Sequence, residues 1–280
     1  MRCLTNVLGL GLGLCFLLSD YSPSRAQTSY GQIIRQAVEA MQGDSLQRAD
    51  SLLHQALKSA PNHVATPLVY RYLGQIREQL GYPQEALENY SKGLQHKADD
   101  VELRLDRAAL LYRMGLHQRA LSDYSDVLRL QPKHIEALQM RAHIQASLRN
   151  YKSARLDYET ILHLEPLNSR AQVGLILVND RSGRPREALD RINALVSMFP
   201  DSALYRAVRG GMLHRRKQYE YALADLNEAI RLCPTCADYY ISRATLYLDM
   251  RKRRLARQDT KEAVRLGADP REMAALLKKD

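Results

Sequence analysis

The chain has 280 residues, of which 45% are hydrophobic and 26% are charged, and it holds 10 prolines and 14 glycines. This composition excludes a disordered or fibrous protein, and the length suits either two domains or a single elongated array. The 41 Lys and Arg exceed the 31 Asp and Glu, which gives a net charge of +10 that favours anionic partners without naming one.

The first 26 residues have the features of a secretory signal peptide. Arg2 lies in a short polar segment, residues 7–18 form an apolar run, and residues 24–26 (SRA) offer the small side chains that a signal peptidase reads. The apolar run is too short to cross a bilayer as a stable helix. We therefore expect cleavage before Gln27 and an exported protein, periplasmic or extracellular, whose mature chain has no transmembrane span. A retained N-terminal anchor is the alternative.

Beyond this segment, residue types recur with a period of 34. The prolines that share one place are Pro132, Pro166, Pro200 and Pro234. One alanine series consists of Ala86, Ala120, Ala154, Ala188, Ala222 and Ala256. A second series holds small residues at most of its places, namely Gly74, Ala108, Ala142, Gly210 and Ala244. A fixed period of this length predicts stacked supersecondary units.

Each unit is expected to contain two helices joined by a turn. Small and apolar residues recur at helical spacing in residues 103–115 and again in 117–130, and a glycine such as Gly115 often lies in the turn. The proline ends the second helix because it cannot continue the backbone hydrogen bonds. The small residues allow the two helices to cross closely.

In period and residue types, this pattern resembles the tetratricopeptide repeat family. The resemblance implies an all-α fold, a right-handed α-solenoid of about seven helix-turn-helix repeats with a C-terminal capping helix. The expected repeats are 67–100, 101–134, 135–168, 169–202, 203–236 and 237–270, preceded by an N-terminal segment (27–63) with a degenerate repeat and followed by a cap (271–280). The sequence departs from the family where a bulky fourth residue is replaced by Arg104, Gln172 or Arg206.

Four repeats carry a coupled pair of charged residues. Arginine occupies the seventh place and aspartate the twenty-third, as Arg107 and Asp123, Arg141 and Asp157, Arg209 and Asp225, and Arg243 and Asp259. The other repeats lack both partners. We expect a bidentate ion pair between the two helices or to a neighbouring repeat. The alternative is an anion-binding site at each arginine, which is disfavoured because a lone buried guanidinium is costly.

A Cys-x-x-Cys sequence, Cys233 and Cys236, raises the question of dithiol chemistry. The repeat phase places it in a turn between repeats, with Cys236 where a short polar residue would cap the next helix. We expect a structural disulfide or a plain turn, and a catalytic dithiol remains the alternative. Two cysteines make only half of a tetrahedral zinc site.

The chain contains none of the sequence signatures of nucleotide-binding loops, zinc proteases, serine hydrolases or calcium-binding loops. The eight histidines fall at different repeat phases, and none forms a chelating pair one helical turn apart. We therefore expect no enzymatic activity, no cofactor and no metal.

Resemblance to the family implies a concave groove lined by the first helix of each repeat. Such a surface suits an extended peptide or a partner helix. The candidate groove residues are Arg71, Gln75, Tyr112, Arg113, His143, Leu177, Arg181, His214, Arg215 and Leu248. The alternative is that the protein's own N-terminal segment, residues 27–66, fills part of this face.

A second candidate surface is a basic ridge formed by the turns within the last repeats. Its residues are Arg215, Arg216, Lys217, Arg251, Lys252, Arg253 and Arg254. A ridge of this kind attracts an acidic protein, anionic lipid or polysaccharide, and a nucleic acid partner is not expected in an exported protein. Alternatively, these cations only complement the dipoles at helix C-termini.

Together these features predict a non-enzymatic scaffold of the cell envelope that binds peptide or helical protein partners in its groove. The first alternative is an adaptor that docks on anionic lipid or glycan through the basic ridge. The second is a thiol-active accessory protein that uses Cys233 and Cys236.

Overall fold

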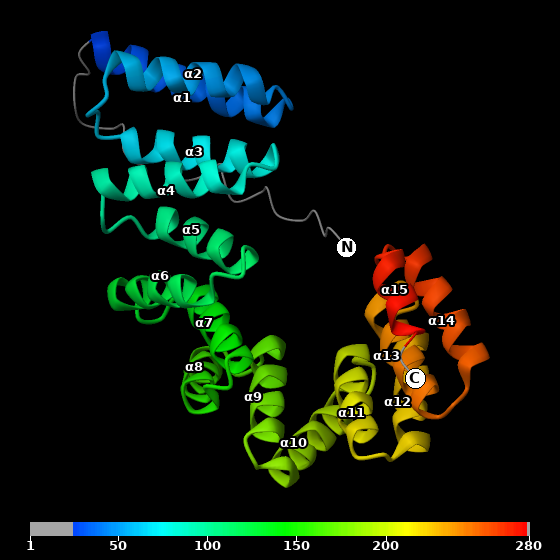
Figure 1. Cartoon of the computed structure of the whole chain (residues 1–280). Coiled ribbons are helices and arrows are strands. Elements are labelled where there is room, and N and C mark those ends of the chain that lie inside the picture. Colours follow the sequence, from blue (N-terminus) through cyan, green and yellow to red (C-terminus); the bar gives the residue numbers. More distant parts are fainter. Residues whose placement is uncertain (1–24, 279–280) are drawn as a thin grey trace. The chain divides into compact units, whose positions relative to one another are not determined.

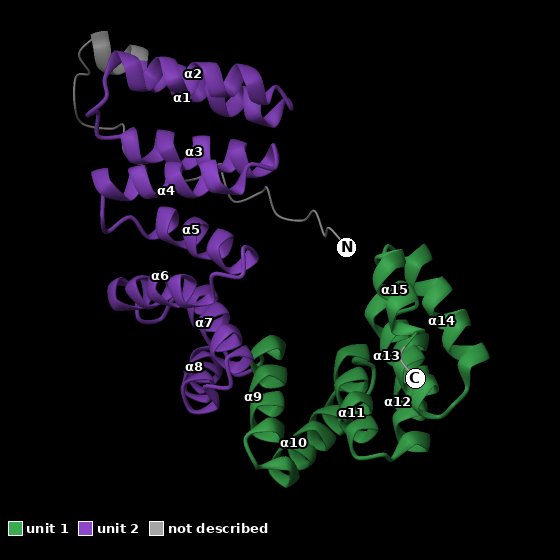
Figure 2. Cartoon of the chain, viewed as in Figure 1, with its two compact units in different colours: residues 1–5, 167–280 green, residues 6–166 purple. Residues whose placement is uncertain are grey.

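The structure is a computed structural model that describes residues 25–278, and these residues contain helices and turns but no strand. The predicted signal peptide lies outside the described residues, except for Arg25 and Ala26, which begin the first helix. The described chain forms two compact units (Figure 2). We call residues 25–166 the N-terminal unit and residues 167–278 the C-terminal unit.

The N-terminal unit consists of four helical hairpins (Figure 1). Its helices are α1 (Arg25–Gln42), α2 (Leu46–Ser59), α3 (Thr66–Gln79), α4 (Pro83–His96), α5 (Val101–Arg113), α6 (His117–Leu130), α7 (Ile135–Ser147) and α8 (Tyr151–Leu164). Each helix packs against the next one along the chain. Residues 27–66, the alternative occupant of the groove, instead contribute the hairpin α1–α2. Its buried Tyr30 and Leu53 share a core with Leu73 of α3.

The C-terminal unit consists of three hairpins and a short terminal helix. Its helices are α9 (Ser169–Arg181), α10 (Pro185–Met198), α11 (Ala203–Arg215), α12 (Tyr219–Leu232), α13 (Ala237–Asp249), α14 (Arg253–Arg265) and α15 (Pro270–Leu276). Met273 of α15 is buried against Ala263 of α14 and Ala237 of α13. The all-α repeat fold predicted from the sequence is confirmed for the described residues.

Each turn within a hairpin contains one residue with left-handed backbone geometry. In three hairpins it is Gly81, Gly115 or Gly183. In three others the same place holds Arg149, Lys217 or Arg251, with φ of 64°, 59° and 59°. Glycine adopts this geometry freely, whereas a residue with a Cβ atom loses about 1 kcal/mol. The turns therefore share one backbone shape, which is strained where the residue is basic.

The joints between hairpins follow the predicted pattern of helix ends. For example, Gln131 is the C-cap residue of α6, and Pro132 follows it. The next helix is then capped by a short polar side chain that accepts a hydrogen bond from a backbone amide three residues further on. These capping residues are Asp100, His134, Asn168 and Ser202.

The small residues predicted at the helix crossings are needed for close packing. Ala108, Ala142 and Ala244 are fully buried. A Cβ atom added at Gly74 would lie only 2.3 Å from Cε1 of Tyr90, a ring that is itself fully buried between α3 and α4. In the equivalent place, a Cβ atom on Gly210 would lie 3.0 Å from Cγ of Leu226.

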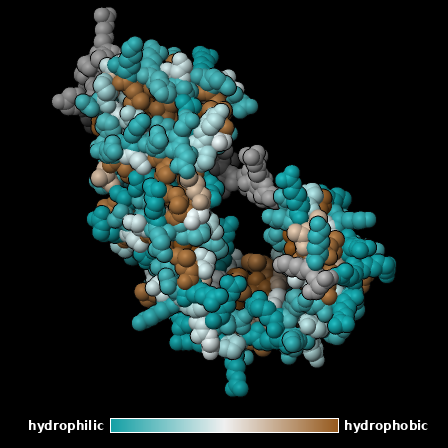
Figure 3. Space-filling model, in the orientation of Figure 1, coloured by the Kyte–Doolittle hydropathy of each residue, from teal (hydrophilic) through white to brown (hydrophobic). Residues whose placement is uncertain are grey.

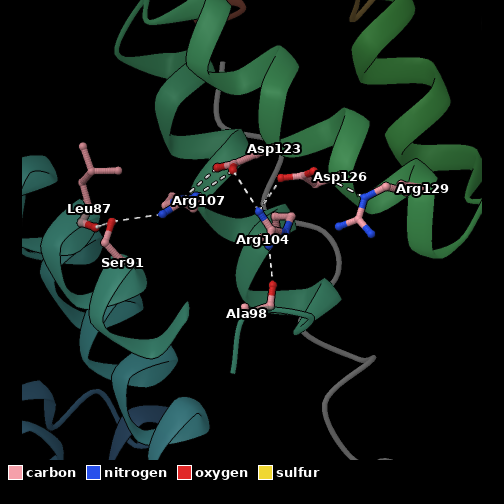
Figure 4. Close-up of polar contacts among 8 residues, drawn as sticks. All are labelled: Leu87, Ser91, Ala98, Arg104, Arg107, Asp123, Asp126 and Arg129. Atoms are coloured by element: carbon pink, nitrogen blue, oxygen red, sulfur yellow. Dashed lines mark hydrogen bonds and ion pairs between the residues drawn. The ribbon is translucent and has the colours of Figure 1, made fainter. Parts of the chain in front are cut away.

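The predicted Arg–Asp pairs are confirmed, and each one joins three helices (Figure 4). In the example drawn, the Nε and Nη2 atoms of Arg107 donate to the two carboxylate oxygens of Asp123 at 2.8 and 2.7 Å. Its Nη1 atom donates to the hydroxyl of Ser91 in the preceding hairpin at 3.2 Å. We call this arrangement the guanidinium clamp. The Arg–Asp pair therefore lies within one hairpin, as the first form of the prediction had it, and the contact with the neighbouring hairpin is made to a hydroxyl and not to a carboxylate.

The same clamp recurs at Arg141, Arg209 and Arg243, whose third donor reaches Ser125, Asn193 and Asn227. The aspartates are nearly buried, with side-chain exposures of 4 to 7%. Because each of these arginines is paired with its own carboxylate and donates to a third acceptor in the preceding hairpin, the structure favours the ion pair over the alternative of an anion-binding site at each arginine. Hydrogen bonding to Asp225 raises the pKa of Arg209 above its usual value.

The fourth-place arginines that depart from the family pattern have a structural role. Tyr240 is a bulky residue at this place, and its hydroxyl donates to the carbonyl of Pro234 at 3.1 Å. Arg206 donates to the carbonyl of Pro200 at 2.8 Å, and Arg104 donates to the carbonyl of Ala98. Arginine thus replaces tyrosine as the donor that ties the helix to the joint before it.

Candidate functional site

The first helices of consecutive hairpins lie side by side within each unit, since α3 contacts α5 and α11 contacts α13. Their adjacent side chains form what we call the first-helix face of each unit. All ten residues predicted for the groove belong to first helices. The structure shows that most of them contact residues of a neighbouring hairpin, and that the two units differ in how they do so.

In the N-terminal unit, the first-helix face is occupied by paired polar side chains. The Nε atom of Arg71 donates to Asp106 at 2.6 Å, and its Nη2 atom donates to Glu102 at 3.1 Å. The amide of Gln75 also donates to Asp106, at 3.0 Å. Arg71 and Gln75 are thus brought together on one carboxylate. Asp106 and Glu102 belong to this arrangement although the sequence reasoning did not select them.

The same face continues with an aromatic and ionic cluster. The hydroxyl of Tyr112 lies 2.9 Å from Nε2 of His143, and the Tyr112 ring also contacts the ring of His117. Arg113 pairs with Glu78, which also accepts a hydrogen bond from the buried Tyr90. The predicted residues of this unit therefore bond from hairpin to hairpin, Tyr112 to His143 and the others to carboxylates of the neighbouring hairpin. We call this set of contacts the polar ladder.

In the C-terminal unit, charged pairs lie at the turn end of the first-helix face. Asp180 accepts hydrogen bonds from Arg215 and Arg216, each at 2.7 Å. Burial alone would raise the pKa of Asp180, but the two guanidinium groups lower it below the usual carboxyl value. His214 lies 2.7 Å from Asp249 in the following hairpin. Arg181 is exposed, and no carboxylate within the described residues pairs with it.

Away from the turns, the first-helix face of the C-terminal unit is apolar. Val173 and Leu177 on α9, Ala207 on α11, and Ile241 and Leu248 on α13 are all partly buried. We call these five residues the apolar centre. Partly exposed apolar side chains of this kind gain free energy when a partner covers them, at roughly 25 cal/mol per Å².

The residues of the predicted basic ridge divide into two groups. Arg215 and Arg216 are neutralised by Asp180, and Arg216 also donates to the carbonyls of Met212 and Pro185. The others, Lys217, Arg251, Lys252, Arg253 and Arg254, are exposed in the turns and at the start of α14. The visible surface of each unit is mostly hydrophilic, with separate hydrophobic spots (Figure 3).

Cys233 and Cys236 are joined in a disulfide, with their Cα atoms 5.8 Å apart. Cys233 is the C-cap residue of α12 and Cys236 the N-cap residue of α13, so the disulfide spans one joint between hairpins. Unlike the other capping residues, Cys236 accepts no hydrogen bond through its side chain. The position in a joint agrees with a structural role.

Among residues 25–278, no three potential ligands from His, Cys, Asp and Glu gather into a metal site. Within the same range, no helix is both long and apolar enough to span a bilayer.

Comparison with known proteins agrees with this architecture. The family model for the tetratricopeptide repeat matches residues 179–235. The crystal structure of a tetratricopeptide repeat protein from Parabacteroides merdae is 26% identical, covers 90% of this chain and 98% of its own, and superposes with a TM-score of 0.80. No curated protein sequence shows significant similarity.

Two further solved structures share the fold. MamA from Desulfovibrio magneticus RS-1, from residue 41 to its end, is 24% identical over 59% of this chain and 94% of its own, with a TM-score of 0.52. The Cut9–Hcn1 hetero-tetramer of the APC/C is 16% identical over 89% of this chain and 52% of the matched chain, with a TM-score of 0.57.

Proposed function

We propose that this chain, which has the fold of tetratricopeptide repeat proteins and matches the family model over residues 179–235, is a non-enzymatic scaffold of the cell envelope that binds a partner on the first-helix face of its C-terminal unit. The partner is an extended peptide or an amphipathic helix with apolar side chains. Repeat proteins of this family generally serve as interaction scaffolds, and the described residues contain no metal cluster.

The apolar centre is the observation that carries this proposal. Leu177 on α9 and Ile241 on α13 are partly exposed, and the small Ala207 is on α11, the first helix that comes between them in the chain. A small residue flanked by larger apolar ones leaves room for a side chain of the partner. The corresponding face of the N-terminal unit is less suited, because the polar ladder already satisfies its hydrogen-bonding groups.

The test uses an immobilised array of random peptides, probed with the full chain. We expect selective retention of peptides with spaced apolar residues, and at least a tenfold loss of affinity with Leu177→Asp, since a carboxylate would be buried against the peptide. The matched control is Tyr221→Asp, which changes a 72% exposed residue on the second helix α12 of the same unit. An equal effect of the two substitutions would refute the proposal.

Export is a separate part of the proposal and rests on residues 1–26. Expression of the full chain in a bacterium, followed by N-terminal sequencing of the envelope fraction, should give a chain that starts at Gln27. A full-length chain in the membrane fraction would instead indicate a retained anchor.

A further inference from the structure

The C-terminal unit has a strongly basic surface that the proposed peptide site does not use. Six exposed cations follow one another in the turn before α14 and along that helix, and we call them the polybasic patch. Its members are Arg251, Lys252, Arg253, Arg254, Arg257 and Lys261. On α14, residues 253, 257 and 261 are spaced at one helical turn, so their side chains lie on one side of the helix.

No carboxylate of the described chain neutralises Arg251, Lys252, Arg254, Arg257 or Lys261. The acidic residues nearest to the patch in sequence all have other partners: Asp249 pairs with His214, Asp259 with Arg243, and Glu262 with Arg265. Like charges held this close repel one another, and an anionic partner removes that repulsion.

The backbone supplies a second, independent observation. Arg251 has a φ of 59°, in a place where other hairpins have Gly81, Gly115 or Gly183. Lys217, at the same place in the preceding hairpin, has the same φ. A basic residue therefore stands twice in succession where glycine would be unstrained. The same geometry occurs at Asp44 and Arg149 in the N-terminal unit, so what is particular to the C-terminal unit is that two successive turns each present a cation.

The chemistry of the patch indicates the type of partner. An open hollow of about 390 Å³ is lined by Arg253, Arg254, Arg257, Gln258 and Lys261, without an apolar or aromatic side chain. A specific protein interface has an apolar core, and binding to single-stranded nucleic acid uses aromatic rings that stack on bases. A layer of phosphate headgroups requires neither, because many cation–phosphate contacts act together.

We propose that the polybasic patch docks the protein on the surface of a bilayer that contains anionic phospholipid. The cations of the patch occupy both the turn before α14 and one side of that helix, so they cover an area rather than a single line. An area of charge fits a planar layer of headgroups. This inference goes beyond the proposed peptide-binding function and concerns a different surface.

The test is flotation of the purified mature chain with vesicles of phosphatidylcholine containing about 30% phosphatidylglycerol. We expect binding that disappears with pure phosphatidylcholine or at high salt. The triple substitution Arg254→Gln, Arg257→Gln and Lys261→Gln should weaken binding at least tenfold. A matched triple, Lys92→Gln, Arg119→Gln and Lys133→Gln, removes the same charge from exposed sites of the N-terminal unit and should change binding less than twofold.

A second variant tests whether weaker vesicle binding comes from the lost charge or from a less stable fold. Lys217→Gly combined with Arg251→Gly relieves the strained turns, so the melting temperature should rise while vesicle binding falls at least threefold. Equal binding by the two triple variants would overturn the proposal. Retention on dextran sulfate or an oligonucleotide without any binding to anionic vesicles would also overturn it, and would assign the patch to a soluble polyanion.

Discussion

The two units are built from the same hairpin, yet their first-helix faces differ in kind. In the N-terminal unit the face carries the polar ladder, and residues 25–166 contain 18 Lys and Arg against 16 Asp and Glu. In the C-terminal unit the face has an apolar centre, and residues 167–278 contain 21 Lys and Arg against 13 Asp and Glu. The Arg–Asp pair of the guanidinium clamp has the same geometry in both, and only its third acceptor changes from serine to asparagine. Residues that hold the hairpins together are thus fixed by the repeat, whereas residues on the face are free to diverge.

The largest expected effect tests whether the clamp is equivalent in the two units. Asp123→Ala in the N-terminal unit and Asp225→Ala in the C-terminal unit each leave a partly buried arginine without its carboxylate, so each should lower the free energy of unfolding by about 3 kcal/mol. Urea unfolding followed by circular dichroism measures this. As a control, Asp190→Ala at an exposed site should cost less than about 0.5 kcal/mol. A loss confined to one unit would show that the clamps are not equivalent.

A smaller effect should distinguish the helix crossings of the two units. Gly74→Ala places a methyl group against the buried Tyr90 ring, and we expect a loss of about 2 kcal/mol after the gain in helix propensity is included. At Gly210 the contacts are longer, so Gly210→Ala should be nearly neutral. Thermal unfolding of both variants compares them directly. If Gly210→Ala proved the more damaging change, our account of the two crossings would be incorrect.

Relief of the strained turns should stabilise both units by a similar, modest amount. Arg149→Gly and Lys217→Gly each remove a side chain from left-handed backbone, and each should raise the free energy of unfolding by about 0.5 kcal/mol. The reverse change, Gly115→Arg, should be destabilising. Denaturant midpoints determined with unchanged slopes provide the measurement. Destabilisation by both glycine variants would contradict the assignment of strain.

The smallest effect concerns pH and is expected only in the C-terminal unit. Burial alone would raise the pKa of Asp180, but Arg215 and Arg216 lower it, so this carboxylate stabilises the fold above its unfolded pKa. The contribution is lost as the pH falls through the lower, folded value. The difference in melting temperature between the protein and Asp180→Asn should therefore shrink below about pH 4. A constant difference down to about pH 2 would exclude this role.

The side-chain contacts within one hairpin could be predicted from the sequence, whereas the contacts between hairpins could not. Arg107 and Asp123 are 16 residues apart in the same repeat, so the period alone could pair them. The contact of Arg71 with Asp106 depends on the lateral offset of two stacked helices, which a period does not define. A signal was nevertheless present, because several of these pairs are separated by 35 residues, one more than the repeat.

The pairing of two residues of the basic ridge with Asp180 could not be predicted either, because it is also a contact between hairpins. Arg215 and Arg216 lie in the same basic run as Lys217, and only the reach of their side chains to Asp180 distinguishes them. The cysteines were placed correctly in a joint, because that position follows from the repeat phase and not from lateral packing.

The disulfide has a consequence for the biosynthesis of the protein. At α5, α7, α9 and α11 the first turn of the hairpin is secured by a polar side chain that needs no particular environment, as with Ser202 at α11. At α13 a covalent bond replaces that hydrogen bond, because Cys236 caps no amide. The disulfide forms only in an oxidising compartment. In a reducing compartment, the start of α13 would have neither the covalent bond nor a side-chain cap.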